Sequence, residues 1–411
     1  MLTSDPVRLL ERFQALAAAH PLDARLRSGS ADVHLVGGAV RDLVLGREPR
    51  ELDLVVEGDL EPVVLALAGE RRQFERFGTA TISRDGFVYD LARARSETYE
   101  RPGALPVVAP ADLATDLRRR DFTVNAIALG LFGPARGRLL AAEHALEDLA
   151  AGQLRVLHPA SFLDDPTRLL RLSRYASRLG FEVETATRGL AEAAVASGAL
   201  ETVSGNRLGA ELRLAAGEAD PIAALAALGS LGLDSAVAPG FGLAQPEAAR
   251  RALELLPGDG DRAALVIAAA ALGMPSSDRD QMLARLAFPA PSREVIREAA
   301  LRAPALADAL AGAPTGSAVA AAVGAAPVEA VALAGGVAAR RPVGGERAAR
   351  RWLDEWRLVS LEIDGEDLLA AGVARGPAIG AGLRAALAAK LDGRARGRAA
   401  ELAEALKAAL A

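Results

Sequence analysis

The sequence predicts an α+β protein in which a small mixed sheet comes first and an all-helical region follows. Short apolar runs, each ended by glycine or another turn residue, are confined to the N-terminal part of the chain and cover 33–36, 52–56, 79–83 and 87–92. From about Pro159 onward, alanine- and leucine-rich segments with helical spacing replace them. This change predicts a domain boundary near Pro159.

Composition narrows the classes of function. The chain has 411 residues, of which 51% are hydrophobic, so two or three cores are expected. A net charge of −5 excludes attraction of the whole molecule to nucleic acid, so RNA binding would depend on local patches. The absence of cysteine excludes disulfides and thiolate metal sites and is compatible with the cytoplasm, where we expect the protein to act. Pro327 and Glu329 interrupt the most apolar stretch, 317–338, so we expect no membrane segment and, with no apolar signal core at the start, no secretion.

Periodicity and turn residues set the order of elements in the first part. We expect an amphipathic helix over 5–27, a βαβ-like unit over 33–56, a helix over 60–70 and a hairpin that turns at Asp85-Gly86. The proline-rich segment 97–112 lacks periodicity and predicts a long loop. From Asp112 to Leu131 the spacing of apolar residues is helical.

The unit over 33–56 carries features of a nucleoside triphosphate site. Gly37 and Gly38 open its helix, where backbone amides can approach phosphate oxygens. Glu51 and Asp53 occupy alternate positions at the start of its second strand, so both point to one face, about 7 Å apart. Such a pair suits a hard divalent cation, above all Mg2+ shared with a phosphate-bearing substrate. Each feature alone is more often a turn or two solvated acids, whereas the combination is more specific.

Two further charged residues, Arg41 and Asp90, each allow two interpretations. Arg41, one turn into the first helix of this unit, would place a cation near bound phosphates, or would form a helix-surface ion pair with Asp42. Asp90 interrupts an otherwise apolar strand, so it either lies at an exposed edge or acts together with Glu51 and Asp53.

A basic segment at 118–125 is the next candidate. Arg119 could hold triphosphate oxygens bidentately, and Asn125, one turn after Asp121, could hold a sugar hydroxyl. The alternative is a solvated basic helix start.

The segment 164–178 gives the clearest helical signal. Asp165 before Pro166 is typical of a helix entry. The arginines that follow fall on one stripe of this helix and are Arg168, Arg171, Arg174 and Arg178. The stripe indicates phosphate or RNA binding, and a merely solvated face is the alternative.

Asp165 and Arg168 together suggest base selection. The Watson–Crick edges of cytosine and adenine share an amino donor beside an unprotonated ring nitrogen. Asp165 could accept from the amino group while Arg168 donates to the ring nitrogen. Uracil and guanine would leave these groups unpaired and would be rejected.

Taken together, these motifs resemble those of the bacterial class II tRNA nucleotidyltransferases, the CCA-adding enzymes, and of their poly(A) polymerase relatives in the polymerase β superfamily. The resemblance covers about half of the chain. The segments that carry it are 35–42, 52–55, 119–126, 146–149, 165–171 and 204–207, with a further likeness at 363–368.

The resemblance implies a catalytic head with a small mixed sheet, followed by helical neck, body and tail. We place an N-terminal helix at 1–30, the head at 31–155, the neck at 156–215, the body at 216–340 and the tail at 341–411.

The resemblance also implies substrates and ligands. It implies two Mg2+ ions on Glu51 and Asp53, CTP and ATP as substrates, and tRNA rather than DNA as the partner. The segment from Arg119 to Asn125 would contact ribose and triphosphate, Asp165 and Arg168 would select the base with the other stripe arginines nearby, and 102–110 would belong to a mobile loop.

Two positions depart from the usual pattern of the family. Glu51 stands where most members carry the shorter aspartate, and residues 141–145 stand where many have Asp-Pro-Phe-Gly-Gly. A catalytically inactive, RNA-binding member of the fold is therefore the alternative from a different class. Within the class, the alternatives are enzymes that add only CC, only A, or poly(A).

Overall fold

The computed structural model describes residues 2–27, 29–74, 78–338 and 344–411. The chain divides into two compact units, the first made of Met1–Leu208 with Leu231–Ala236 and the second of Gly209–Ser230 with Val237–Ala411. The predicted division into five parts is finer and stays a prediction. Its boundary between body and tail, at 340/341, lies outside the described residues.

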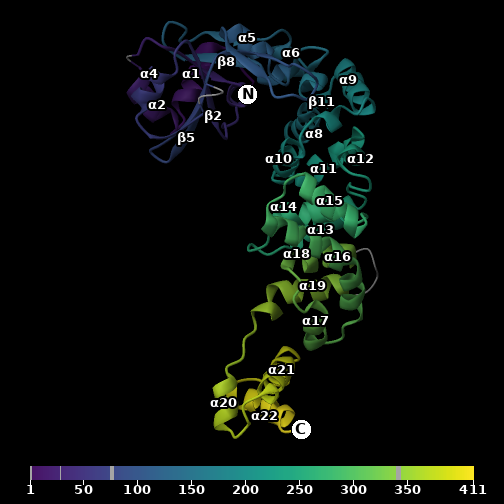
Figure 1. The fold of residues 1–411 in the computed structure, drawn as a ribbon. Helices are drawn as coiled ribbons and strands as arrows, with labels where there is room; N and C mark the ends of the chain where they lie inside the picture. The colour runs from purple at the N-terminus through teal and green to yellow at the C-terminus, as the bar shows by residue number, and fades with distance from the viewer. Residues whose placement is uncertain (1, 28, 75–77, 339–343) are drawn as a thin grey trace. The chain divides into compact units, whose positions relative to one another are not determined.

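A seven-stranded sheet forms the centre of the first unit (Figure 1). Its strands, in their order across the sheet, are β3 (Glu70–Phe74), β4 (Thr79–Arg84), β5 (Phe87–Arg93), β2 (Leu52–Glu57), β1 (Asp32–Val36), β8 (Ile127–Phe132) and β9 (Leu139–Ala141). β2 and β5 run parallel, and the other neighbours run antiparallel. The predicted mixed sheet is confirmed, and so is the hairpin of β4 and β5, whose turn residues Asp85 and Gly86 both have positive φ.

Two predictions about this sheet are wrong. Residues 33–56 have the predicted order of strand, helix and strand but do not form a parallel βαβ unit, because β1 and β2 are antiparallel neighbours, with Leu35 opposite Leu54. Residues 127–131, expected to end a helix, belong to β8 beside β1. Every residue of β8 is buried, so both faces of the strand are apolar and the alternation typical of a half-exposed strand is missing.

Helices and short strands surround the sheet. The α-helices of this unit are α1 (Pro6–Gln14), α2 (Ala19–Leu26), α3 (Gly38–Val44), α4 (Glu61–Leu67), α5 (Leu113–Arg118), α6 (Ala145–Ala151), α7 (Ser161–Asp164), α8 (Thr167–Leu179) and α9 (Thr185–Ala196). Its 3-10 helices are η2 (Thr123–Asn125) and η3 (Ala199–Thr202). The helix predicted over 5–27 is therefore two helices, α1 and α2.

Two small strand pairs complete the first unit. β6 (Arg95–Thr98) and β7 (Val107–Pro110) form an antiparallel hairpin where a long loop was predicted. β10 (Gln153–Leu154) and β11 (Glu182–Val183) form a short parallel pair. The predicted change to an all-helical region therefore comes after β11 rather than at Pro159.

The described residues of the second unit contain helices and no strands. These are α11 (Pro221–Ser230), α13 (Pro246–Leu255), α14 (Arg262–Ala270), α15 (Ser276–Arg285), α16 (Ala290–Gly312), α17 (Gly316–Val323), α18 (Val328–Ala338), α19 (Gly345–Asp354), the 3-10 helix η4 (Trp356–Leu358), α20 (Gly365–Ala370), α21 (Pro377–Leu391) and α22 (Arg398–Ala409). Two more, α10 (Gly205–Ala216) and α12 (Leu233–Val237), cross the division between the units.

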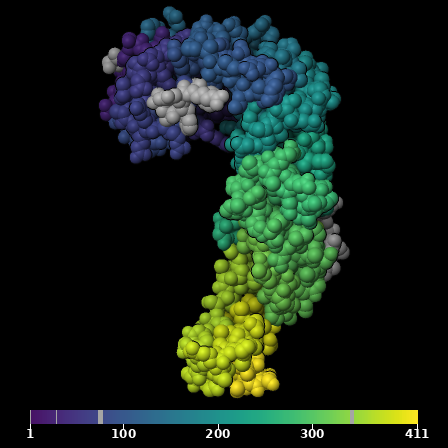
Figure 2. Space-filling model, viewed as in Figure 1, coloured from purple at the N-terminus to yellow at the C-terminus, as the bar shows by residue number. Residues whose placement is uncertain are grey.

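The last three helices, coloured yellow in Figure 2, share a small core of their own. It centres on Leu368, Ala386 and Ala405. Among the described residues, no single helix is long and apolar enough to cross a membrane. α17 and α18 pass that test only as a pair, and the pair is bent by 116°.

Candidate active site

Three carboxylates gather on and beside the parallel strands β2 and β5. Asp53 and Asp90 are register partners, so their side chains lie on the same face of the sheet, and Glu51 precedes β2 by one residue. Thr81 on β4 donates a hydrogen bond to Asp90 Oδ1 at 2.6 Å. Asp90 is exposed but lies on an inner strand of the sheet beside Asp53, and its action together with the other two acids stays a prediction.

The charges around Asp53 show which groups share this region. Burial raises the pKa of Asp53, Arg120 lowers it, Asp90 and Glu51 raise it further, and Arg171 lowers it. The sheet carboxylates therefore repel one another and lie within electrostatic reach of arginines from two other segments.

The donor set fits a divalent cation that is shared with a substrate. Among the described residues, no three His, Cys, Asp or Glu side chains form a ready-made metal cage. Mg2+ is usually held by one or two protein carboxylates together with water and phosphate oxygens. Asp53 and Glu51 supply such a partial set. Burial, and to a smaller extent repulsion by Asp90 and Glu51, raise the pKa of Asp53, and a bound cation would relieve the repulsion.

The glycine turn before α3 brings two arginines close to the sheet. Gly37 has φ +67°, and a Cβ at this position would lie 2.8 Å from Arg120 Nη1. A Cβ on Gly38 would lie 3.3 Å from Arg41 Nη2. The backbone conformation therefore favours glycine at Gly37, and a larger residue would also displace the end of the Arg120 side chain.

Arg41 is buried rather than part of a surface ion pair. Its Nε and Nη2 donate to Asp42 Oδ1 at 2.9 and 2.8 Å, and its Nη1 donates to Asn125 Oδ1 at 2.6 Å. Arg41 therefore fixes the amide of Asn125, and its predicted contact with phosphate stays a prediction.

Asp121 links the basic segment to α8. Arg171 Nε and Nη2 donate to its Oδ2 at 2.9 and 2.6 Å, while Asn125 Nδ2 and the Phe122 amide donate to its Oδ1 at 3.0 and 2.8 Å. Burial alone would raise the pKa of Asp121, but the charge of Arg171 and these hydrogen bonds lower it to about 2. Asp121 is therefore ionised and positions both Arg171 and Asn125.

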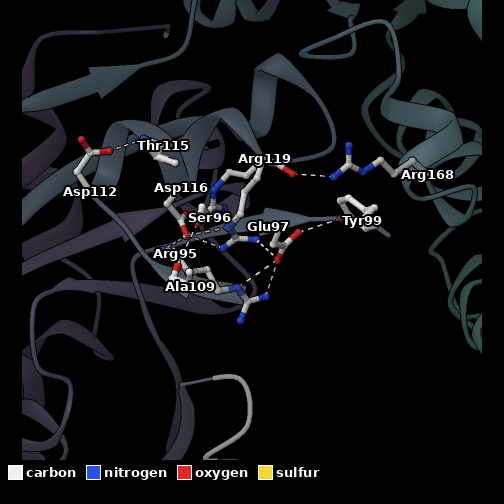
Figure 3. A network of polar contacts seen from close by, with 11 residues as sticks. Arg95, Ser96, Glu97, Tyr99, Ala109, Asp112, Thr115, Asp116, Arg119 and Arg168 are labelled. Atoms are coloured by element: carbon white, nitrogen blue, oxygen red, sulfur yellow. Dashed lines mark hydrogen bonds and ion pairs between the residues drawn. The ribbon is translucent and has the colours of Figure 1, made fainter. Parts of the chain in front are cut away.

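Arg119 is held by two carboxylates (Figure 3). It donates to Asp116 Oδ1 through Nε and Nη2, at 2.9 and 2.6 Å, and to Glu97 Oε1 through Nη1 at 2.9 Å. Arg120 donates to the other oxygen of Asp116 at 3.1 Å. Asp116 therefore holds both arginines, one on each carboxylate oxygen.

Asp165 and Arg168 lie at the start of α8 and are both engaged by protein groups. Asp165 Oδ1 accepts from the Thr167 amide and hydroxyl at 3.1 and 2.6 Å and from Arg207 Nη2 at 2.8 Å. The contact with Thr167 agrees with the predicted helix entry. Arg168 is buried and donates to Ser161 Oγ and to the Arg119 carbonyl, each at 2.7 Å.

The arginine stripe of α8 is largely covered. Arg168 and Arg174 are buried, and Arg171 and Arg178 are half-buried. The burial of Arg168 and Arg174 excludes a merely solvated face. The predicted nucleotide contacts of Arg171 and Arg174 stay predictions.

The tip of the β6–β7 hairpin is anchored to the helices after it. The Gly103 amide donates to the Leu163 carbonyl at 3.2 Å, and Arg207 Nη1 donates to the Gly103 carbonyl at 3.0 Å. Tyr99 donates to Glu97 Oε2 at 3.0 Å. Burial and Glu97 raise the pKa of Tyr99, which also senses the charges of Arg168 and Asp165.

Sequence reasoning missed several residues that organise the site, namely Glu97, Tyr99, Asp116, Tyr175 and Arg207. Asp116 precedes Arg119 and Arg120 by about one helical turn, and Tyr175 follows Arg171 by one, so both carried a local signal. The contacts of Glu97 with Arg119 and of Arg207 with Asp165 join residues far apart in the sequence.

Part of the chain is similar to a known domain family. Residues 33–155 match the model of the poly A polymerase head domain. The β2–β5 carboxylates and the segment from Arg119 to Asn125 all fall within it.

The similarity to curated proteins and solved structures covers more of the chain than residues 33–155. An A-adding tRNA nucleotidyltransferase of Halalkalibacterium halodurans is 39% identical over 237 residues, which are 56% of this chain and 53% of the relative. A CC-adding tRNA nucleotidyltransferase of Deinococcus radiodurans is 38% identical over 227 residues, 54% of this chain and 60% of the relative. The chain thus spans about half the length of these two curated relatives. The structure of the Thermotoga maritima CCA-adding enzyme complexed with tRNA matches with a TM-score of 0.79 and 27% identity over 99% of both chains.

Proposed function

We propose that this chain is a template-independent nucleotidyltransferase that adds C and A from CTP and ATP to the 3′ end of tRNA and releases pyrophosphate. The observation that supports this most is the shared electrostatic environment of Glu51, Asp53 and Asp90 with Arg120 and Arg171. It puts candidate metal ligands beside candidate triphosphate ligands, as in-line phosphoryl transfer requires. The named relatives and the solved CCA-adding enzymes support the same reaction class.

Each group has a distinct role in the proposed mechanism. Glu51 and Asp53 would hold two Mg2+ ions, with Asp90 assisting. Such ions, when bound, would acidify the tRNA 3′-hydroxyl and neutralise the departing pyrophosphate. Arg171 and its neighbours would bind the triphosphate, and Asn125, fixed by two hydrogen bonds, would bind the sugar hydroxyl.

Base selection would take place at the start of α8. Within the described residues, Nη1 and Nη2 of Arg168 each donate one hydrogen bond. Because a guanidinium has five N–H donors, others remain that could donate to a ring nitrogen of the base. Asp165 would accept from the amino group of cytosine or adenine through Oδ2, since its bonds to Thr167 and Arg207 all use Oδ1. Incorporation of UTP as readily as CTP would refute this role of Asp165 and Arg168.

The central test is Asp53→Ala. We expect loss of nucleotide incorporation while the dissociation constant for tRNA stays within a few-fold of wild type, because Asp53 would act on the metal and not on tRNA. The matched control is Glu70→Ala, which removes an exposed carboxylate from the edge strand β3 of the same sheet and should leave incorporation unchanged. Unchanged turnover of Asp53→Ala would refute the metal role.

An A-adding enzyme is the second candidate. The A-adding relatives of Halalkalibacterium halodurans, Geobacter sulfurreducens and Aquifex aeolicus are 39%, 42% and 42% identical to this chain. Purified protein would be given tRNA that lacks CCA or only the terminal A, with CTP or ATP alone. A CCA-adding enzyme extends both substrates, whereas an A-adding enzyme extends only tRNA that already ends in CC.

Glu51 distinguishes an active enzyme from an inactive relative. Glu51 is exposed and lies one residue before the paired part of β2, so the strand does not fix its side chain as it fixes Asp53. Its longer side chain can therefore reach the position that aspartate would occupy, and we expect wild type to be active. An inactive wild type with an active Glu51→Asp variant would instead identify an RNA-binding protein that has lost catalysis.

A further inference from the structure

Tyr175 collects three arginines around one aromatic ring. The guanidinium carbons of Arg41, Arg171 and Arg174 lie 5.6, 5.5 and 5.0 Å from the centre of its ring. Arg41 comes from α3 and the other two come from α8. Phe122 meets the same ring edge-on, at 5.9 Å between centroids and 80° between planes.

A guanidinium within about 6 Å of a ring centre is attracted to the negative face of the aromatic ring. Three such cations placed close together would otherwise repel one another. Asp42 and Asp121 offset part of this repulsion through their bonds to Arg41 and Arg171. All three guanidiniums contact this ring, so it connects the glycine-turn helix with α8.

The position of Tyr175 argues for more than packing. Its ring is half-buried, and its hydroxyl oxygen accepts from Arg171 Nη2 at 3.4 Å. A leucine at this position would keep apolar contact with Phe122 but would offer no negative face to the arginines. Loss of the ring would therefore loosen cations without removing them.

We propose that Tyr175 is a positioning residue for the nucleotide site, whose ring holds the guanidinium groups of Arg41, Arg171 and Arg174 as one cationic cluster that receives the triphosphate. This inference rests on the proposed function, because it assigns the triphosphate to this cluster. It predicts that the electron density of the ring at position 175, rather than its size, sets the affinity for nucleotide.

The test replaces Tyr175 in the full-length chain by phenylalanine, difluorophenylalanine, trifluorophenylalanine and leucine. Fluorine withdraws charge from the face of the ring while its size changes little. The readout is the dissociation constant of CTP with Mg2+, measured by calorimetry without tRNA so that catalysis is not needed. We expect Tyr175→Phe to bind within about threefold of wild type, and the constant to rise stepwise with fluorination to roughly tenfold, as for Tyr175→Leu.

Tyr89 provides the matched control. It is a buried tyrosine of β5 in the same unit, and its hydroxyl donates to the Ala18 carbonyl at 2.8 Å. The same fluorinated series at position 89 starts from Tyr89→Phe and should leave the CTP dissociation constant flat. Unfolding midpoints for both series separate a loss of packing from a loss of nucleotide affinity.

The outcomes separate this inference from the proposed function. A CTP dissociation constant that does not change with fluorination at position 175, or a wild type that does not bind CTP, would overturn the role of Tyr175. If wild type binds CTP with the expected fluorine dependence but extends no tRNA, the proposed function fails and the role of Tyr175 stands.

Discussion

The ion pair between buried Asp121 and half-buried Arg171 should carry a measurable share of the stability of the first unit. Both Arg171 nitrogens that face Asp121 bond to Oδ2, at 2.9 and 2.6 Å, and the side chains are 8% and 29% exposed for Asp121 and Arg171. Asp121→Asn keeps the size of the side chain but removes its charge. It also turns either an amide N–H or a weaker acceptor toward the guanidinium.

The expected loss follows from the pKa of Asp121. A fall from the ordinary value of 3.8 to about 2 corresponds to about 2 kcal/mol at neutral pH, since one pKa unit is about 1.4 kcal/mol. Because the pKa in the folded state is the lower one, this stabilisation is present above pH 4 and is lost as pH falls from about 4 towards 2. The difference between wild type and Asp121→Asn should shrink over that range.

Urea unfolding followed by tyrosine absorbance would measure the loss of stability in the first unit. All three tyrosines, Tyr89, Tyr99 and Tyr175, lie in the first unit, whereas Trp352 and Trp356 lie in the second. Tryptophan fluorescence therefore monitors a unit that Asp121→Asn should leave unchanged.

An exposed ion pair in the same unit gives the control. Arg71 Nη1 lies 3.0 Å from Glu61 Oε1, and these side chains are 49% and 42% exposed. Glu61→Gln should cost less than about 1 kcal/mol, because water screens exposed pairs. If Asp121→Asn costs no more than Glu61→Gln, the conclusion that Asp121 anchors Arg171 is wrong.

Three other substitutions test separate parts of the first unit. Gly37→Ala should lower the free energy of unfolding by about 1–2 kcal/mol, because alanine is strained at φ +67°. The added Cβ would also displace Arg120 and should weaken CTP binding. Unchanged urea midpoints would contradict the predicted loss of stability. Burial lowers the pKa of His34, although the charge of Glu57 opposes this shift. The free energy of unfolding should therefore fall as pH drops below 6.5, and in urea titrations His34→Leu should reduce this dependence on pH. Gly103→Ala should detach the hairpin tip and speed limited proteolysis within 99–106, since its Cβ would collide with η3; wild-type cleavage rates would refute the anchor.

Sequence reasoning predicted the sheet well where local chemistry decides the structure. The β4–β5 hairpin was predictable because Asp85 and Gly86 adopt the positive φ that a tight hairpin turn needs. β3 was not predicted, since its segment, 70–74, is mostly charged or polar and forms the edge of the sheet. β8 was mistaken for a helix because burial on both faces removes the alternation.

For the candidate site, sequence reasoning identified residue types but not their partners. The spacing of Glu51 and Asp53 was visible, whereas the pairing of Asp53 with Asp90 depends on β2 and β5 being parallel neighbours. The bond between Arg171 and Asp121 joins residues 50 positions apart. Such contacts are set by how the strands and helices pack, which periodicity does not specify.

The charged side chains of the site form an acidic group and a basic group, which are complementary to the metal ion and to the phosphates of a magnesium nucleotide. Asp53 lies among carboxylates whose repulsion helps to raise its pKa, and three arginines crowd around Tyr175. Each group of like charges costs energy in the nucleotide-free protein. A bound metal ion would relieve the carboxylates and a triphosphate would relieve the arginines, so the two groups favour the same ligand. Nucleotide bound without Mg2+ would relieve only the arginines, and we therefore expect Mg2+ and CTP to strengthen each other's binding.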